Sequence, residues 1–314
     1  MESSEKHPLF KPVLATALGI LFVSTASIFI RFAQSEASSI AIATFRLVIA
    51  SLILVPLAVI RNQSELKRLN RDELIKAGLS GFFLAMHFTV WISSLEFTSV
   101  ASSVVLVTTT PLWVALFSPL VLKESIRKSV IIGLLISMAG SVIVGLGNAC
   151  QLEGGVLECQ SLMSGSRAMF GNFLALLGAW MAAGYMLMGR QLRKKLKTLS
   201  YVTLVYGIAA VILIVITVIR REPIFSYSPR TYFWLVALGL IPQLLGHSLF
   251  NWALEFISAA YVSLTLLGEP IGTIILALIF LKESPTFLEG IGAGLILLGI
   301  VVASLWRSKV ISEA

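Results

Sequence analysis

Charged residues are scarce in this sequence. Only 13% of its 314 residues are Asp, Glu, Lys or Arg, while 57% are hydrophobic. Because a soluble domain carries roughly 25% charged residues, this composition excludes an ordinary water-soluble fold. Cysteine and histidine are rare too, at two and three residues, and the sequence shows no zinc-ligand cluster, phosphate-binding loop or carboxylate pair. We therefore expect no enzyme, no cofactor and no metal site.

Long apolar segments fill most of the chain. About 20 apolar residues cross a bilayer as an α-helix, and ten segments meet that requirement. The first segment is too long for the core of a signal peptide, lacks a small-residue cleavage site and leads directly into a second span. The expected helices cover residues 12–34, 37–60, 73–95, 99–121, 128–147, 168–189, 199–219, 230–254, 258–281 and 285–306.

The second half of the chain repeats the first half in one ungapped register. With a shift of 159 positions, Leu95-Glu96-Phe97 aligns with Leu254-Glu255-Phe256, and Pro111 aligns with Pro270. The same shift aligns Leu122-Lys123-Glu124-Ser125 with Leu281-Lys282-Glu283-Ser284. Such agreement indicates a duplicated unit. Since each unit holds five helices, we expect an all-α integral membrane fold in which ten transmembrane helices form two inverted five-helix repeats.

The duplication also divides the chain into segments. Repeat 1 covers residues 12–147, repeat 2 covers 168–306, and an extracytoplasmic linker covers 148–167. The short polar tails, 1–11 and 307–314, are expected on the other side of the membrane. Nothing in the sequence supports a soluble domain.

The net charge of +8 is distributed unevenly across the expected membrane. Of the 24 Lys and Arg residues, 17 fall on the side of the two termini, six fall on the opposite side, and Arg46 lies within a span. The positive-inside rule therefore places both termini in the cytoplasm, in a multi-pass protein of the plasma (inner) membrane. The basicity is explained by topology, so we expect no nucleic-acid partner.

Both cysteines, Cys150 and Cys159, lie in the expected extracytoplasmic linker. Two cysteines that close a short loop in an oxidising compartment are typical of a disulfide. We predict a Cys150–Cys159 disulfide, with two unpaired thiols as the alternative.

Two symmetry-related prolines, Pro111 and Pro270, lie in the middle of the fourth and ninth expected helices. Proline frees a backbone carbonyl and permits a kink, which lipid tolerates only where protein or a wet cavity satisfies the freed group. A gated central site needs two kinks at similar depth, so we interpret both prolines as gating kinks. A mere irregularity in helix packing is the alternative.

Small residues recur in the fifth and tenth expected helices. Gly133, Ser137, Ser141 and Gly145 are spaced by four, and glycines recur at 290, 292, 294 and 299. Such stripes let two backbones approach closely in lipid. We interpret both helices as packing elements and expect a monomer, with a homodimer as the less favoured alternative.

Four ionisable side chains lie within the expected spans: Arg46, His87, His247 and Glu269. Each is costly in hydrocarbon and should face the interior or a cavity. Glu269 precedes Pro270, and the repeat places Thr110 at the equivalent position, so a carboxylate faces a hydroxyl across a central site. Glu269 is expected to bind an amine or a proton, or else to pair with Arg46. Arg46 is interpreted as a structural charge that snorkels or pairs within the bundle, with binding of a substrate carboxylate as the less favoured alternative.

Further polar and aromatic residues share helix faces with the two histidines. His87 and Trp91 are four apart, as are His247 and Asn251, so each pair shares a face. An intramembrane histidine relays protons or bonds a substrate, or it simply bonds a neighbouring helix. Trp180 and Tyr185 add aromatic walls in one interpretation and anchor the bilayer interface in the other.

One short motif points to a different class of protein. Gly78-Leu79-Ser80-Gly81 matches the GxSG of rhomboid-type intramembrane proteases, with His247 as the conceivable base. However, Ser80 falls near the start of its helix while His247 lies deeper, and a ten-helix duplication is not a rhomboid pattern. We retain proteolysis at Ser80 only as an unfavoured alternative.

The chain resembles the EamA family of the drug/metabolite transporter superfamily over nearly its whole length. The resemblance implies a central cavity lined by helices 1, 3, 4, 6, 8 and 9, with helices 2, 5, 7 and 10 outside. Because Arg46 belongs to helix 2, the resemblance argues against Arg46 as a substrate ligand. It places His87, Trp91, Thr110, His247, Asn251 and Glu269 near the pathway. The matching segments are 253–260, Glu269-Pro270, Leu281-Lys282-Glu283-Ser284, Gly292, Gly299 and Phe45-Arg46-Leu47.

From these observations we expect a secondary transporter that works by alternating access and exports small metabolites such as amino acids. The alternative within transporters is a drug or organic-cation efflux protein with Glu269 as its cation site. The expected partners are a small-molecule substrate and the lipid bilayer. The motifs are shared by the fold and do not identify the substrate.

Overall fold

The computed structural model describes residues 10–98, 103, 106–153, 156–159, 166–280 and 287–305. The protein is an all-helical membrane protein of ten helices, with one short β-hairpin between the two repeats. Six helices are long and apolar enough to cross a bilayer, the last of them formed by α9 to α10. Those six are α1 (Phe10–Ala33), α2 (Ser39–Lys67), α3 (Arg71–Phe97), α7 (Ser166–Arg193), α8 (Thr198–Ile219) and the run from α9 (Pro229–Leu238) to α10 (Ser248–Ala253).

Several helices begin at a polar side chain that caps free backbone N–H groups. Ser38, Ser228 and Ser258 each accept a hydrogen bond from the backbone N–H three positions later in the chain. Asn70 forms a capping box with Glu73 at the start of α3. Because the first N–H groups of a helix have no partner within it, these caps fix where each helix begins and keep the turns short.

The fourth and ninth predicted helices are both broken at their prolines. α5 (Thr110–Val121) begins one residue before Pro111, after a turn at residues 108–109. In the second repeat, α11 (Ala259–Thr265) passes through a 3₁₀ turn, Leu266–Gly268, into α12 (Glu269–Phe280). Pro270 is thus the second residue of its half-helix, as Pro111 is of α5. Proline at such a position needs no N–H partner and has a backbone angle already suited to a helix start.

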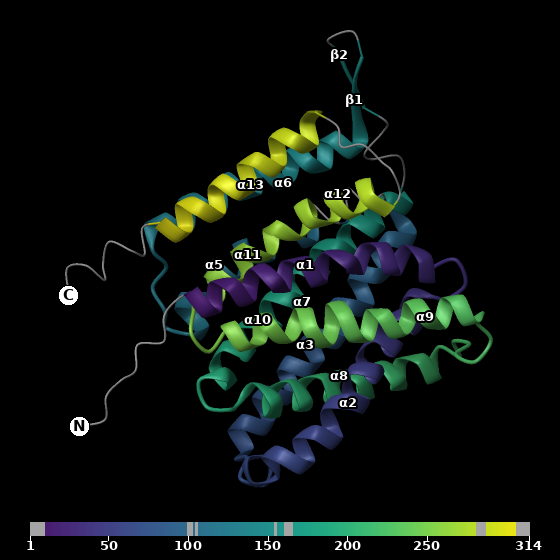
Figure 1. The fold of residues 1–314 in the computed structure, drawn as a ribbon, viewed down its shortest axis with the longest axis vertical. Coiled ribbons are helices and arrows are strands. Elements are labelled where there is room, and N and C mark those ends of the chain that lie inside the picture. The colour runs from purple at the N-terminus through teal and green to yellow at the C-terminus, as the bar shows by residue number, and fades with distance from the viewer. Residues whose placement is uncertain are drawn as a thin grey trace, which may run out of the picture.

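α6 (Lys128–Ala149) and α13 (Phe287–Leu305) lie side by side along one side of the bundle (Figure 1). The backbones meet at glycines: a Cβ on Gly140 would lie 2.6 Å from the Gly292 carbonyl oxygen. Ser137 adds a hydrogen bond to the Ile296 carbonyl at 3.2 Å. The expected close packing of these two helices is therefore found. In contrast, a Cβ on Gly290 or Gly294 would meet none of the described residues within 4 Å, so both glycines lie outside this contact.

The start of α1 and the end of α13 lie at one end of the helix bundle, and the hairpin projects from the other end (Figure 1). This is the arrangement that five crossings in each repeat require. The hairpin consists of β1 (Cys150–Glu153) and β2 (Val156–Cys159), paired antiparallel with Cys150 opposite Cys159. Opposed Cα atoms in such a pair are about 4.5–5.5 Å apart, within the range that a disulfide spans. The disulfide itself stays a prediction.

Candidate functional site

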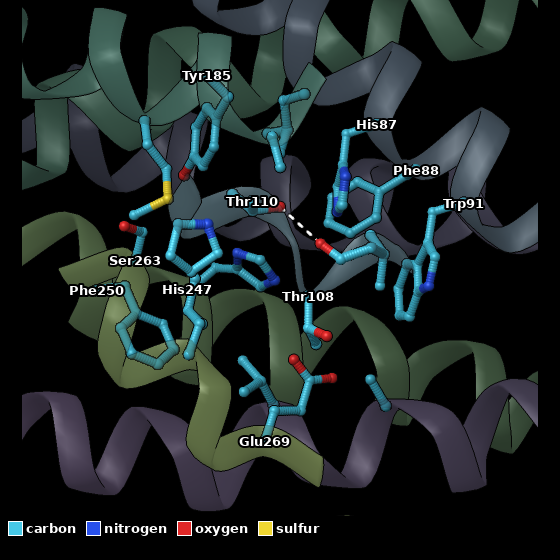
Figure 2. Close-up of a pocket in the computed structure, with 18 of the residues that line it drawn as sticks. His87, Phe88, Trp91, Thr108, Thr110, Tyr185, His247, Phe250, Ser263 and Glu269 are labelled. Atoms are coloured by element: carbon cyan, nitrogen blue, oxygen red, sulfur yellow. Dashed lines mark hydrogen bonds between the residues drawn. The ribbon is translucent and has the colours of Figure 1, made fainter. Parts of the chain in front are cut away.

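A cavity of about 80 Å³ lies in the middle of the bundle between the two repeats (Figure 2). By general packing rules this volume has room for several water molecules. Its lining is mainly apolar, and comes from α1, α3, residues 107–111, α7, residues 247–254 and the broken helix α11 to α12. These are helices 1, 3, 4, 6, 8 and 9, the set that the resemblance implies, and one residue of α2 joins them.

Glu269 and Thr110 lie where the two broken helices face the cavity. Figure 2 shows the Glu269 carboxylate pointing into the cavity toward Thr108, and Thr110 donating to the Val107 carbonyl. That hydrogen bond is 2.8 Å long and satisfies a carbonyl at the break. Ser24 of α1 donates to the Glu269 backbone carbonyl at 3.1 Å, which holds the start of α12 against α1. The predicted carboxylate and hydroxyl both line the cavity.

The two histidines lie on the same cavity wall as Phe88. The His87 ring is stacked on Trp91, with 5.7 Å between ring centroids, and its Nδ1 lies 2.9 Å from the Gly178 carbonyl oxygen of α7. The His247 ring meets Phe88 edge-on at 5.6 Å. Thus His87 both bonds a neighbouring helix and lines the cavity, so the two interpretations of this histidine are compatible. The Trp91 Nε1 is buried and has no hydrogen-bond partner among the described residues.

Tyr185 and Asn251 belong to a hydrogen-bonded network that ties three helices together. The Tyr185 hydroxyl donates to Asn251 Oδ1 at 2.7 Å, and Asn251 Nδ2 donates to the Tyr206 hydroxyl of α8 at 3.0 Å. Both residues also line the cavity. Trp180 does not line the cavity. The residue is 38% exposed, and its ring meets that of Trp113 edge-on with 5.2 Å between ring centroids. Five residues turn a helix by about 140°, so Trp180 and Tyr185 of one helix face different ways.

Arg46 lies inside the bundle, which is one of its two predicted places. The side chain is 1% exposed, so it does not snorkel, and it forms no ion pair with Glu269 within 4.0 Å. Instead Arg46 lines the cavity, its guanidinium carbon lies 4.2 Å from the Phe88 ring centroid, and Nε donates to Gln243 Oε1 at 2.8 Å. The physical reason is that α2 packs against α3 and the helix of Gln243, so the long side chain reaches between them.

The partner of Arg46 comes from an element that the sequence did not predict. Residues Gly239–His247, labelled η1 here, form a π-helical stretch between α9 and α10. Such segments are rare and often accompany functional sites. Gly239 allows close approach of Ile49, and Gly246 that of Val23. Gly239, Pro242 and Gly246, three helix-weakening residues close together, were the available sequence signal.

Ser80 has no catalytic partner in the described structure. It is fully buried, and its hydroxyl lies 3.2 Å from the Tyr201 hydroxyl and 3.4 Å from the Tyr185 carbonyl oxygen. The neighbouring Gly81 is in close contact with Ile208 of α8. The GxSG match is therefore explained by helix packing.

Ion pairs gather at the end of the bundle where α1 begins and α13 ends. Glu124 accepts from Arg190 Nε at 3.0 Å and from Lys194 Nζ at 2.9 Å. Arg193 pairs with Glu255, and Arg190 also donates to the carbonyls of Leu254 and Glu255. Every salt bridge among the described residues lies at this end. We call Glu124, Arg190, Arg193, Lys194 and Glu255 the terminal-end latch.

The chain is similar to a known protein family and to individual proteins. The sequence model of the EamA-like transporter family matches residues 10–146 and 169–305. An uncharacterized transporter of Clostridium kluyveri is 24% identical over 81% of this chain and 79% of its own length. An uncharacterized transporter of Archaeoglobus fulgidus is 23% identical over 94% of this chain and 97% of its own length.

A solved crystal structure shares the fold of the chain. Its TM-score is 0.76 at 18% sequence identity, and the match covers 95% of this chain and 98% of the other. At that identity the likeness concerns the fold alone. The two matched ranges of the family model coincide with the two halves that the internal repeat relates.

Proposed function

This chain belongs to the EamA-like transporter family, and from that premise we propose that it exports small metabolites such as amino acids by alternating access. Membership is shown by the two family matches, which together cover most of the chain, and it makes the protein a membrane transporter and not an enzyme. The choice of substrate, the direction and the mechanism are our proposal.

The observation that carries the proposal is the place of the cavity. It lies between inverted repeats, at the breaks of two repeat-related helices, and its polar side chains come from both halves. Transporters built from inverted repeats bind substrate near the bilayer midplane, next to discontinuous helices. Rocking of one repeat against the other about Pro111 and Pro270 would expose this cavity to each side in turn.

The terminal-end latch supports alternating access because its ion pairs hold one end of the bundle and can break when that end opens. The 159-residue shift aligns Arg190 with Arg31 and Glu124 with Glu283. Arg31 is exposed and forms no salt bridge with any residue in the described ranges, and Glu283 lies outside them. We propose that Arg31 and Glu283 pair when the opposite end closes, and that the pairs of Glu124 then break.

A direct experiment is transport by the purified protein in proteoliposomes. Vesicles are loaded with labelled amino acids one at a time, and efflux is compared with that from protein-free vesicles and from vesicles carrying the Pro111→Ala, Pro270→Ala double variant. We expect saturable efflux of at least one amino acid with the wild-type protein. If efflux never exceeds that of protein-free vesicles, the proposal that the protein exports amino acids is wrong.

The second candidate, efflux of a drug or organic cation, is favoured by one feature. Glu269 supplies a carboxylate inside a mainly apolar cavity, a setting that suits an amine with an apolar body. The same vesicles loaded with labelled tetraphenylphosphonium test it.

We further propose that the protein lies in the plasma (inner) membrane with both termini in the cytoplasm. The distribution of Lys and Arg along the sequence supports this orientation, since 17 of the 24 basic residues are expected on the side of the two termini. The hairpin with Cys150 and Cys159 would then face the oxidising side, where their disulfide is expected to form.

A further inference from the structure

We infer that Arg46 is the anion-binding group of the cavity and holds the carboxylate of the transported molecule. The inference rests on the proposed transport function and narrows it to substrates that carry a carboxylate. It favours the carboxylate-binding role, which the sequence offered only as the less favoured alternative, over a structural role for Arg46. Four observations support it.

The first observation is the unused hydrogen-bonding capacity of the Arg46 side chain. A guanidinium carries five N–H donors, and the only hydrogen bond of the Arg46 side chain among the described residues is the one from Nε to Gln243. Nη1 is fully buried and has no partner in that part of the chain. A buried cation with most of its donors unused is costly, so the site is incomplete without a further acceptor.

The second observation is that Arg46 reaches the cavity with a restrained side chain. Arg46 is the one α2 residue that lines the cavity, while Gln243 fixes Nε and the Phe88 ring lies against the guanidinium plane at 4.2 Å. Both contacts restrict the side chain to one orientation. A guanidinium held in this way presents a planar fork, which matches the two oxygens of a carboxylate.

The third observation is the position of Glu269. Its carboxylate points into the same cavity but forms no ion pair with Arg46 within 4.0 Å. The cavity therefore holds one cationic and one anionic group that do not neutralise each other by direct contact. A zwitterion, with its carboxylate at Arg46 and its ammonium nearer Glu269, is complementary to both.

The fourth observation is the rest of the lining. Apart from these charges the walls are formed largely by aliphatic and aromatic side chains, among them Leu84, Trp91, Met186, Phe250 and Leu267. These side chains solvate an apolar group well and a third charge poorly. The structure thus assigns the cavity to small amino acids or related zwitterions with an apolar side chain. It disfavours organic cations that lack a carboxylate as substrates.

The test measures binding to the purified full-length protein by thermal shift. The probes are leucine, methionine and phenylalanine, the three amines that remain after removal of their carboxylate, and the three acids that lack the amino group. We expect at least one amino acid to raise Tm and its matching amine to have no effect. If the amines stabilise as well as the amino acids do, or none of the amino acids and acids raises Tm, the inference is wrong.

Three variants separate binding from folding. Arg46→Gln should weaken the affinity for the amino acid by about 10- to 100-fold, the range expected for loss of a charged hydrogen bond. Arg46→Lys keeps the charge without the planar fork, so about tenfold weaker binding is expected even if Arg46→Gln does not fold. The matched control is Arg61→Gln, which removes an exposed arginine of the same helix, outside both the cavity and the latch, and should leave the affinity unchanged.

Failure of this inference differs from failure of the proposed function. Wild-type affinity in both Arg46 variants would overturn the role of Arg46 while transport of the amino acid still stands. Conversely, binding that depends on Arg46 without any movement in proteoliposomes would overturn the transporter mechanism and leave the binding site in place.

Discussion

At the scale of single residues, the cavity is distinguished by two opposite charges that are not paired. On insertion scales, a charge at the centre of a transmembrane helix costs about 2.5–3.5 kcal/mol. A structural ion pair between Arg46 and Glu269 would lower that cost, yet no such contact is formed. Neighbouring hydrogen bonds join other groups around the cavity: Ser24 donates to the Glu269 backbone carbonyl, and the Tyr185 hydroxyl donates to Asn251. The charges are thus left available to a ligand.

Replacing Glu269 by glutamine distinguishes the two substrate classes. Under the amino-acid proposal Glu269→Gln should still move substrate, with a weaker dependence on pH, because the amide keeps the shape and loses the titrating proton. Under the organic-cation alternative it should abolish transport. The measurement is efflux from proteoliposomes across a pH series, beside Glu73→Gln as a control at the bundle end. Unchanged efflux at every pH would remove Glu269 from both mechanisms.

At the scale of elements, the broken helices 4 and 9 are the features that place polar groups at mid-membrane. Each half-helix starts with a proline in its second position, and a hydroxyl or carboxylate precedes it, Thr110 in α5 and Glu269 in α12. The positive end of the helix dipole and free N–H groups are present at such a start. One break faces the other across the cavity, as the inverted repeat requires.

Removing these prolines should slow transport more than it weakens binding. In Pro111→Ala or Pro270→Ala the segment regains an N–H and a continuous helix becomes more favourable, by about 3 kcal/mol on helix propensity scales. We expect a several-fold lower efflux rate with nearly unchanged affinity. Pro119→Ala is the matched control, because Pro119 is an exposed proline of the same helix, away from the break. Equal rates in all three variants would contradict a gating role.

The α6–α13 pair provides a second prediction at this scale. Gly140→Ala would place its Cβ 2.6 Å from a backbone carbonyl oxygen of Gly292, which cannot move without shifting α13. Overpacking of this kind costs about 1–3 kcal/mol, so Tm of the purified protein should fall.

Gly294→Ala is the control for that change. A Cβ at this position of α13 would meet none of the described residues within 4 Å, so Tm should stay equal or rise. A similar Tm for the two variants would show that the glycine contact does not matter for stability.

At the scale of the whole molecule, the structure is asymmetric although its two halves are related. The end with the chain termini is held by the terminal-end latch, while no salt bridge joins the described residues of the opposite end. There, Glu36 accepts hydrogen bonds from the Ser228 N–H and hydroxyl, which lower the pKa of its carboxyl. Under the proposed mechanism, the latch pairs are those that would form when the terminal end closes.

Weakening the latch should open that end. Glu124→Gln removes the charge that Arg190 and Lys194 share, and such partly exposed pairs contribute up to about 1 kcal/mol. We expect a cysteine at Ser118, which is 2% exposed beside the latch, to react about fivefold faster with a maleimide.

The background for that experiment replaces Cys150 and Cys159 by serine. Asp72→Asn is the control, because it breaks an ion pair at the same end that does not involve the latch. If Glu124→Gln and Asp72→Asn give the same labelling rate, the latch does not hold this end closed.

Much of the architecture followed from local properties of the sequence. Helix number, the inverted duplication and the breaks at Pro111 and Pro270 depend on hydropathy, spacing and backbone chemistry, which act within a few residues. The same holds for the shared face of His87 and Trp91, whose rings are stacked in the structure. These features needed no knowledge of which helix packs against which.

Only the tertiary structure decided where individual side chains face. The sequence left Trp180 and Tyr185 with the same two interpretations, yet only Tyr185 lines the cavity, and Arg46, for which a structural role was favoured, lines it too. The π-helical stretch that brings Gln243 to Arg46 was not predicted. The reason is physical: hydropathy fixes that a segment crosses the membrane, while its rotation about its own axis is set by neighbouring helices that are distant in sequence.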